Sequence, residues 1–529
     1  MKNIKSIIAA SVSLGCLVSC THNFEDINTN PNKFLFGQEK AYNCVEPIIY
    51  GTARNVQNYS YFWNNELVQM TAYTAGATRQ EHMYSITGGN WQSVWDAYAR
   101  YGFDSHHMID LAVRDGDKFL EGVGLVMKVH CLSNLVSLFG DIPFVEAYKG
   151  RTEGILEPAF DSQEDVFGYL LRDLDSANVI FSRNPKPVRT GLDGMYDDDA
   201  ASWRKFANSL KLRLLLRVSG INDKYWAQMQ EIIDNPSMYP VFTSNDDNAR
   251  VRFKVTDPYM SYFGNDKITE SDFTGHRVTE QVIKMMTVLD ADGNATYEDP
   301  RLNYWAKMRS GKWKGTISGC TEGQKNAADE GAAIPNYELL ARPEMDAFYM
   351  DYSELLFIYA EGKLKGKLNL PETVKAYYEK AVAASMEKWS AYNTFTAKAR
   401  PIKAKDVDTF LASAIGSFDN AGTEESIYGS QEELVLSQKW LSLYYVLFEP
   451  YNEWRRTEYP VLTIGDGTIS NNFELPTRFG YPNYTVSTNS ANVGIALERM
   501  GGANDMHTAL VWSYKKLNGG NHRNPYEAK

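Results

Sequence analysis

Residues 355–389 read LLFIYAEGKLKGKLNLPETVKAYYEKAVAASMEKW and decide the class of fold. Two segments with helical apolar periodicity flank the turn at 366–371, where a glycine and a proline mark the end of one helix and the start of the next. Small residues such as Ala360 and Ala381 alternate with large ones such as Trp389. The stretch therefore predicts two antiparallel helices whose side chains interlock.

This hairpin resembles a degenerate tetratricopeptide-type unit, although the signature of that repeat does not recur along the chain. Helical periodicity does recur, and it covers 91–113, 122–139, 203–218, 345–364, 373–389 and 432–451. Asp161 and Glu164 have the spacing of a capping box ahead of another amphipathic segment, Val166 to Ala177. Strand-like alternation is scarce, and 251–255 is among the few candidates. We predict a mostly α fold built on tetratricopeptide-type helix pairs with few short strands.

Three long irregular segments, at about 222–274, 290–342 and 464–506, carry much of the Gly, Asn and Pro. No Pro-, Ser- or Gly-rich linker separates them from the helices, so we expect residues 41–529 to form a single composite domain. Irregular segments of this length in a compact protein are usually functional, and ligand or partner binding is their common role.

The N-terminal residues have the pattern of an export signal. Lys2 and Lys5 precede a short apolar run at 7–18, which is too short to span a bilayer, and Leu17-Val18-Ser19-Cys20 follows. This ending resembles a bacterial lipoprotein signal and makes Cys20 the predicted site of lipidation, with 1–19 removed and 20–40 as a tether. An ordinary signal peptide that ends at a cysteine is the alternative. After residue 19, we expect no apolar run long enough for a transmembrane helix.

Composition disfavours several classes of function. The 54 basic residues are outnumbered by 66 acidic ones, and no cluster of Lys or Arg offsets this, so nucleic acid is an unfavourable partner. Cys44, Cys131 and Cys320 are widely spaced and suggest neither a disulfide framework nor a zinc site, and we expect Cys131 to be a small core residue. Nucleophile-elbow, metalloprotease and phosphate-loop motifs are absent, so we predict a protein that is not an enzyme and uses no cofactor.

One weak metal pattern is present. Alternate positions hold the first four ligand types of a calcium loop, at Asp290, Asp292, Asn294 and Thr296. Ala295 then stands where such a loop requires Gly, and Arg301 stands where it requires the bidentate Glu. We therefore predict a solvated polar turn and no metal site.

Four segments together resemble the SusD/RagB family of outer-membrane nutrient-binding lipoproteins. They are the Cys20 signal followed by FEDINTNPN at 24–32, FGDIPF at 139–144, EDPRL at 298–302 and YNEWRRTEYP at 451–460. The resemblance implies a helix-pair scaffold with a loop-rich second layer, anchored by lipid to the cell outer membrane and facing the exterior. It also implies an oligosaccharide ligand that is passed to a SusC-like TonB-dependent transporter. A peptide-binding member of the family is the alternative, and a lipoprotein glycoside hydrolase is a more distant one.

Two of these motifs also have a purely structural interpretation. Gly140 and Pro143 follow an apolar helix as a stop signal, so we give that turn no ligand role. Glu453, Arg455 and Arg456 have the charges to form a buried acid–arginine cluster, and we expect packing from them instead of binding.

Sugar binding needs flat rings beside polar side chains, because sugars expose C–H faces and hydroxyl edges. Two stretches supply both, and the family resemblance implies a pocket in these two regions. The predicted ligand-binding residues are Tyr73, Arg79 and Asn90 in the first, and Asn303, Tyr304, Trp305 and Trp313 in the second. The alternative for Trp305 and Trp313 is that they pin their loop to the body. Trp91 and Trp95 lie at helical spacing and are expected to pack in the core.

Overall fold

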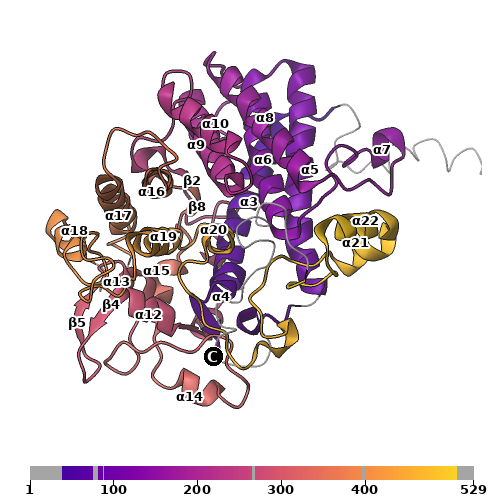
Figure 1. The fold of residues 1–529 in the computed structure, drawn as a ribbon. Coiled ribbons are helices and arrows are strands. Elements are labelled where there is room, and N and C mark those ends of the chain that lie inside the picture. The colour runs from indigo at the N-terminus through magenta and orange to yellow at the C-terminus, as the bar shows by residue number, and fades with distance from the viewer. Residues whose placement is uncertain (1–37, 75–80, 87, 265–267, 396–399, 509–529) are drawn as a thin grey trace, which may run out of the picture.

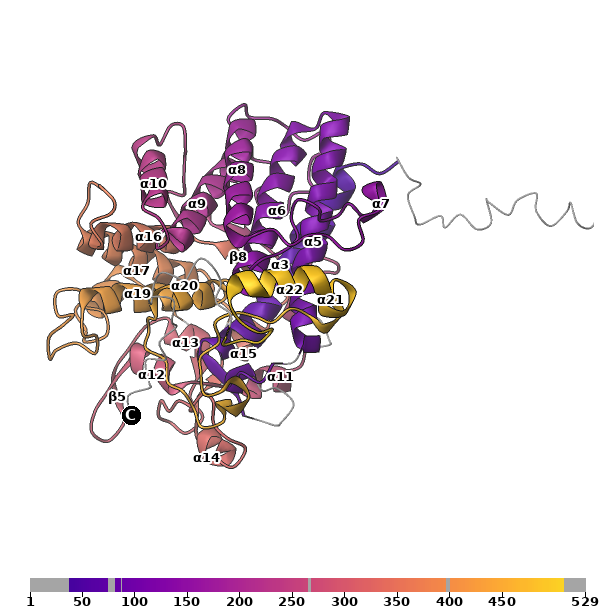
Figure 2. The same ribbon diagram turned by 45° about the vertical axis from the view of Figure 1, so that its right-hand side comes forward.

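The computed structural model describes residues 38–74, 81–86, 88–264, 268–395 and 400–508. It is mostly helical, as predicted, and its long helices pack as successive antiparallel pairs (Figures 1 and 2). The first group runs through α3 (Tyr42–Tyr59), α5 (Gly88–Asp115), α6 (Lys118–Phe139), α8 (Gln163–Phe181), α9 (Ala200–Val218) and α10 (Lys224–Asp234). The second comprises α16 (Tyr352–Leu364), α17 (Val374–Ser390), α19 (Gln431–Ser442) and α20 (Glu449–Thr457).

The hairpin predicted at 355–389 is formed by α16 and α17. Asp351 caps α16 by accepting a hydrogen bond from the Glu354 amide at 2.9 Å, and Thr373 caps α17 in the same way. Gly366 has φ +65°, the left-handed conformation that terminates a helix at low cost. At Gly362 a Cβ atom would lie 2.3 Å from the Leu368 side chain, so glycine lets the turn fold back onto the helix.

A second, irregular layer lies beside the helices (Figure 1). The strands of the chain are β1 (Thr71–Tyr73), β2 (Ala249–Val251), β3 (His276–Val278), β4 (Thr287–Leu289), β5 (Ala295–Glu298), β6 (Ala306–Lys307), β7 (Ile334–Pro335) and β8 (Ala347–Met350). Of these, β2 and β8 lie among the helices and pack against α3 (Figure 1). Within the described residues the strands form antiparallel pairs β1–β3, β2–β8, β4–β5 and β6–β7. The short helices are α4 (Asn65–Leu67), α7 (Gly150–Glu153), α11 (Glu270–Thr274), α12 (Glu280–Met286), α13 (Leu302–Trp305), α14 (Lys325–Asp329), α15 (Tyr337–Leu340), α18 (Ala404–Leu411), α21 (Asn483–Thr488) and α22 (Ser490–Met500).

Helix α6 corrects one expectation from the sequence. By length and composition it could cross a membrane, yet 94% of its apolar window is buried within the fold, as in the core helix of a globular protein. Cys131 lies on this helix and is fully buried, as predicted. The helix stops at Gly140, whose φ of +90° confirms the stop signal.

Several predicted boundaries were wrong. The N-cap of α8 is Ser162, which accepts from the Asp165 amide, whereas Asp161 accepts from the Phe144 amide and anchors the preceding turn. The predicted helix at 345–364 begins only at Tyr352, because residues 347–350 pair with β2. The predicted helix at 432–451 is split into α19 and α20, since Tyr445 and Leu447 have positive φ. Periodicity alone did not reveal these interruptions.

The irregular segments also contain more structure than expected. Helix α10 lies in the first segment, and α21 and α22 lie in the third. The calcium-like stretch is the turn between β4 and β5, where Asp290 accepts hydrogen bonds from the amides of Asp292 and Asn294. This confirms a polar turn at that position.

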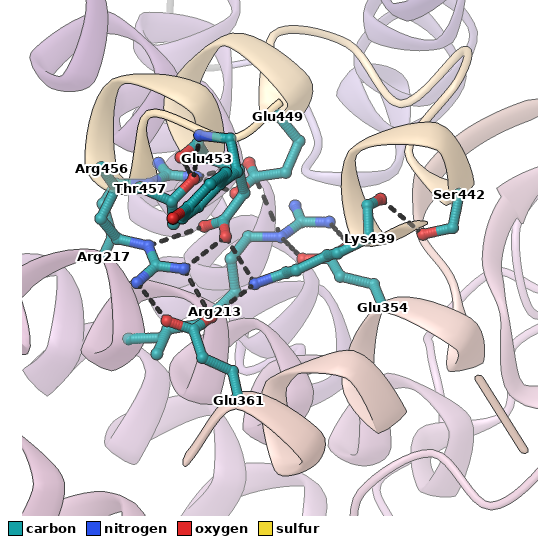
Figure 3. A network of polar contacts seen from close by, with 12 residues as sticks. Arg213, Arg217, Glu354, Glu361, Lys439, Ser442, Glu449, Glu453, Arg456 and Thr457 are labelled. Atoms are coloured by element: carbon teal, nitrogen blue, oxygen red, sulfur yellow. Dashed lines mark hydrogen bonds and ion pairs between the residues drawn. The ribbon is translucent and has the colours of Figure 1, made fainter. Parts of the chain in front are cut away.

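A buried network of charges joins the helix groups (Figure 3). Arg217 of α9 donates to Glu449 of α20 at 2.6 Å, and Arg213 of α9 donates to Glu354 of α16 at 2.5 Å. Beside them, Arg456 of α20 bridges Glu361 and Glu453 at 2.6 Å each, and Lys439 of α19 also pairs with Glu453. All eight side chains are at most 6% exposed, which confirms a packing role for the EWRR stretch.

Removing one charge from this network should destabilise the fold. We expect Glu449→Gln to lower the free energy of unfolding at neutral pH by about 3–5 kcal/mol, because Arg217 is left buried without its partner. Burial opposes ionisation of Glu449, but Arg217 and Arg213 outweigh it and lower its pKa from 4.5 to about 2. Its stabilising contribution is therefore complete above pH 4.5 and is lost as the pH falls towards 2.

Chemical denaturation at a series of pH values tests this expectation. The difference between wild type and Glu449→Gln should shrink as the pH falls from 4.5 to 2. Glu379→Gln, which alters an exposed pair with Lys375, is the matched control and should leave the unfolding midpoint unchanged. Equal midpoints for wild type and Glu449→Gln at neutral pH would contradict a structural role for the network.

Candidate functional site

The strand pair β1–β3 positions the first of the two predicted ligand-binding stretches. Tyr73 lies opposite His276 in this pair, and their rings meet edge to face with centroids 5.1 Å apart. Gly275 makes the contact possible, because a Cβ at that position would lie 2.4 Å from the Tyr73 ring. Tyr73 is half-buried, so part of its ring reaches the surface.

The buried carboxylate of Glu66 makes contacts with both strands of this pair. Glu66 accepts hydrogen bonds from the Tyr73 amide at 2.9 Å and the Thr71 hydroxyl at 2.8 Å, and it pairs with His276 Nδ1 at 2.8 Å. Burial opposes its ionisation, but the charge and hydrogen bond of His276 outweigh burial and lower the Glu66 pKa below its usual value. An ionised Glu66 therefore fixes both Tyr73 and His276.

Asp329 brings the two predicted stretches together at the surface. It accepts from the Thr74 hydroxyl of the first stretch at 2.9 Å and from Arg309 Nη1 of the second at 3.2 Å. It also pairs with Arg277 of β3 at 2.5 Å. Burial opposes ionisation of Asp329, but Thr74 and the two arginines outweigh it, so its pKa is lowered. We call Thr74, Arg277, Arg309 and Asp329 the Asp329 cluster.

The Asp329 cluster is open to solvent and rich in hydrogen-bonding groups. The side chains of Arg309 and Asp329 are 37% and 29% exposed, whereas Arg277 is held rigidly at 8%. Guanidinium groups donate and a carboxylate accepts, so the cluster can pair with neighbouring hydroxyls. Sequence reasoning missed Arg277, Arg309 and Asp329. No local pattern marks them, because the contact exists only after β1, β3 and α14 have packed.

The other predicted residues are dispersed. Arg79 lies outside the described residues, and Asn90 is exposed at the start of α5. Asn303 is half-buried and donates to Glu298 at 3.3 Å. Tyr304 is buried, and its hydroxyl donates to the Arg400 carbonyl at 2.7 Å.

The two predicted tryptophans of the second stretch are buried as well. Trp305 is 3% exposed and packs against Trp389 and Tyr444, so it pins its segment to the body, as the alternative interpretation held. Trp313 is also buried, and its edge borders a hollow of about 460 Å³ that includes Lys314 and Ile283. As placed here, neither ring offers an open face to a sugar.

The remaining motif residues are structural. Arg301 is fully buried and is held by Asp299 at 2.6 Å and by Gln438 at 2.8 Å, so the EDPRL stretch clamps α19. Trp95 packs on Phe139, as expected for a core residue. In the part of the chain that the structure describes, no group of three His, Cys, Asp or Glu side chains is arranged to hold a metal ion.

The protein has a scaffold of paired helices and a loop layer that carries the Asp329 cluster. These features define its class as a helical scaffold protein. A family profile, SusD-like, described as "Starch-binding associating with outer membrane", matches residues 31–482. The chain therefore belongs to the SusD-like family. A search of curated protein sequences finds no match.

Solved structures with the same fold agree with this assignment. A chitin-binding protein is 22% identical with a TM-score of 0.73, and the match covers 89% of this chain and 98% of that one. A SusD homologue from Bacteroides fragilis is 21% identical with a TM-score of 0.72 and coverages of 90% and 98%. A chitin-binding SusD homologue from Flavobacterium johnsoniae is 18% identical with a TM-score of 0.67 and coverages of 89% and 97%.

Replacing the buried carboxylate should loosen the strand pair beneath the site. In Glu66→Gln, a neutral amide with one oxygen cannot accept all the hydrogen bonds that the two carboxylate oxygens accept, so we expect faster hydrogen exchange at Thr71 to Tyr73 and a free energy of unfolding lower by about 1–3 kcal/mol. Because the Glu66 pKa is lowered by folding, its contribution is present above pH 4.5 and is lost as the pH falls below that value. Hydrogen-exchange mass spectrometry measures the effect.

The exposed Glu280→Gln is the control for this experiment and should leave exchange in β1 unchanged. Unchanged exchange in the Glu66→Gln variant would show that β1 is held by other contacts.

Proposed function

We propose that this protein is a cell-surface lipoprotein that binds oligosaccharides and delivers them to a SusC-like TonB-dependent outer-membrane transporter. Family membership supports the role, since the family is described as starch-binding and two similar structures are of chitin-binding proteins. The observation that carries the proposal is the Asp329 cluster. It gathers two arginines, a threonine hydroxyl and a carboxylate on the loop layer.

Capture without turnover fits the chemistry of this cluster. The Asp329 carboxylate is occupied by Thr74, Arg277 and Arg309, which favours its ionised form and suits it to accept hydrogen bonds from hydroxyls. A transport receptor needs modest affinity and an accessible site, and a partly exposed polar cluster suits both needs.

The predicted residues take different parts in this proposal. Tyr73, Arg79 and Asn90 are proposed to contact ligand from the first stretch. Asn303 is proposed to extend the site along the second stretch, whereas the burial of Trp313 argues against the ligand role expected of it. Tyr304 and Trp305 would hold that stretch in place from within, consistent with their burial. Peptide ligands and glycan hydrolysis are the alternatives, and they enter the experiment below as outcomes.

Binding should depend on the surface arginine of the cluster. We expect Arg309→Ala to weaken binding of the preferred glycan about ten- to a hundredfold, because loss of a charged hydrogen-bond donor removes about 1.5–3 kcal/mol. A glycan array would identify that glycan, and isothermal titration calorimetry would measure its affinity. The matched control is Arg400→Ala, an exposed arginine that pairs with Asp406 and should change nothing.

A peptide panel and a product assay complete this experiment. Binding of peptides but not glycans would favour the peptide-binding alternative, and steady release of shorter glycans would indicate an enzyme. Equal glycan affinity in wild type and Arg309→Ala would remove the Asp329 cluster from the site.

Anchoring to the membrane should depend on Cys20. In the native host, we expect Cys20→Ala to abolish incorporation of labelled palmitate and to move the protein from the membrane fraction to the soluble fraction, since no acyl chain can then be attached. Cys44→Ala is the control and should remain in the membrane fraction. Retention of palmitate by the Cys20→Ala variant would refute the predicted lipidation site.

A further inference from the structure

A cavity lies in the helix layer, and its residues are far in sequence from the Asp329 cluster. It has a volume of about 430 Å³ and is enclosed by α5, α6 and the loop that carries α7 (Figure 1). Its aromatic and apolar lining comes from Phe103, His106, His107, Leu132, Phe144 and Tyr148. None of these residues belongs to the site proposed above.

The cavity presents an exposed phenyl ring. Phe103 on α5 is 43% exposed, which is unusual for a phenylalanine on a well-packed helix. His107 stacks parallel to it with ring centroids 6.1 Å apart, and Tyr148 lies against it at 5.3 Å. Exposed rings grouped at the mouth of a cavity are a common sign of a binding site.

The backbone is strained to place one of these rings. Tyr148 has φ +68°, a conformation that bulky residues rarely adopt and that costs on the order of 1–3 kcal/mol. Its hydroxyl donates to the Ala99 carbonyl at 3.3 Å. Gly102 leaves room for it, because a Cβ there would lie 2.9 Å from the Tyr148 hydroxyl oxygen. A tyrosine thus lines the cavity at a backbone conformation that asparagine or glycine would adopt at lower energetic cost.

Most charged groups around the cavity lie close to an opposite charge, and Arg151 adds a further cation to the lining. Lys128 pairs with Asp173 at 2.8 Å, and Lys149 pairs with Glu153 at 3.4 Å. His106 lies 3.8 Å from Asp110, and burial lowers the His106 pKa, so this imidazole is neutral at neutral pH. Lys149, Thr152 and Glu153 add donors and acceptors to the lining. The cavity therefore suits a ligand that is uncharged, apolar on one face and polar at its edge.

We propose that this cavity is a second carbohydrate site, which binds a neutral sugar unit against Phe103 and Tyr148. The C–H face of a pyranose ring would lie on the phenyl group, and its hydroxyls would reach the polar lining. An aliphatic protein side chain would fill the apolar part but would leave these polar groups without partners. The inference rests on the proposed function, since both sites take glycan.

A second site would change how the protein holds a long chain. A glycan long enough to reach both sites would bind its second segment within the same molecule, and overall avidity would rise without a stronger single contact. Short oligosaccharides that cannot occupy both sites would gain nothing.

The experiment compares full-length variants on an array of neutral glycans of graded length. We expect Phe103→Ala to lose about tenfold in affinity for long glycans, because the stacking surface is removed, and Phe103→Tyr to retain binding. Val113→Ala is the matched control, since Val113 lies on the same helix, is 55% exposed and does not line the cavity. The same unfolding midpoint in all variants would show that the exposed substitution leaves the fold intact.

The outcomes separate this inference from the proposed function. If Phe103→Ala binds every glycan as tightly as wild type while Arg309→Ala is weakened, the second site is refuted and the proposed function stands. If wild type binds no neutral glycan, or binds only peptides, both fail. A weakening in Phe103→Ala that grows with glycan length, with Val113→Ala unchanged, supports the second site.

Discussion

The buried network of α9, α16, α19 and α20 is the constraint on which the rest of the structure depends. Taking eight charged groups out of water is costly, and the cost is offset only when each charge meets its partner at hydrogen-bond distance. Arg213 and Arg217 reach from the first helix group to acids of the second. A small shift of one group against the other would leave a buried charge unpaired, so the network selects one packing.

That fixed packing positions the loop layer. Arg301 is another buried arginine that joins two elements. It holds α13 against α19 by donating a hydrogen bond to Gln438. The segment from α13 onward is thereby held, and Trp305 inserts between Trp389 and Tyr444 beneath it. Arg309, a few residues further on, reaches the surface within range of Asp329. The buried Trp305 end of the segment is fixed by the core. It therefore fixes where the exposed Arg309 end lies, and so the geometry of the proposed binding site depends on the core.

Aromatic residues serve two purposes in this chain, and burial separates them. Most of the rings pack in the core, as Trp305 and Trp389 do. A minority stay at least partly accessible, as Tyr73 does on β1 and Phe103 does at the helix cavity. Composition gave the total number of rings, but whether a ring packs or is presented to solvent depends on neighbours that are distant in the chain.

The sequence by itself determined the helix-pair scaffold, the stop at Gly140, the buried character of the EWRR stretch and membership of the family. These follow from local periodicity, from capping chemistry and from the cost of burying unpaired charge. Only the tertiary structure decided that α19 and α20 are separate, that Trp305 is core, and that Thr74, Arg277 and Arg309 share Asp329. Those features depend on contacts between residues up to hundreds of positions apart, and such contacts leave no periodic trace in the chain.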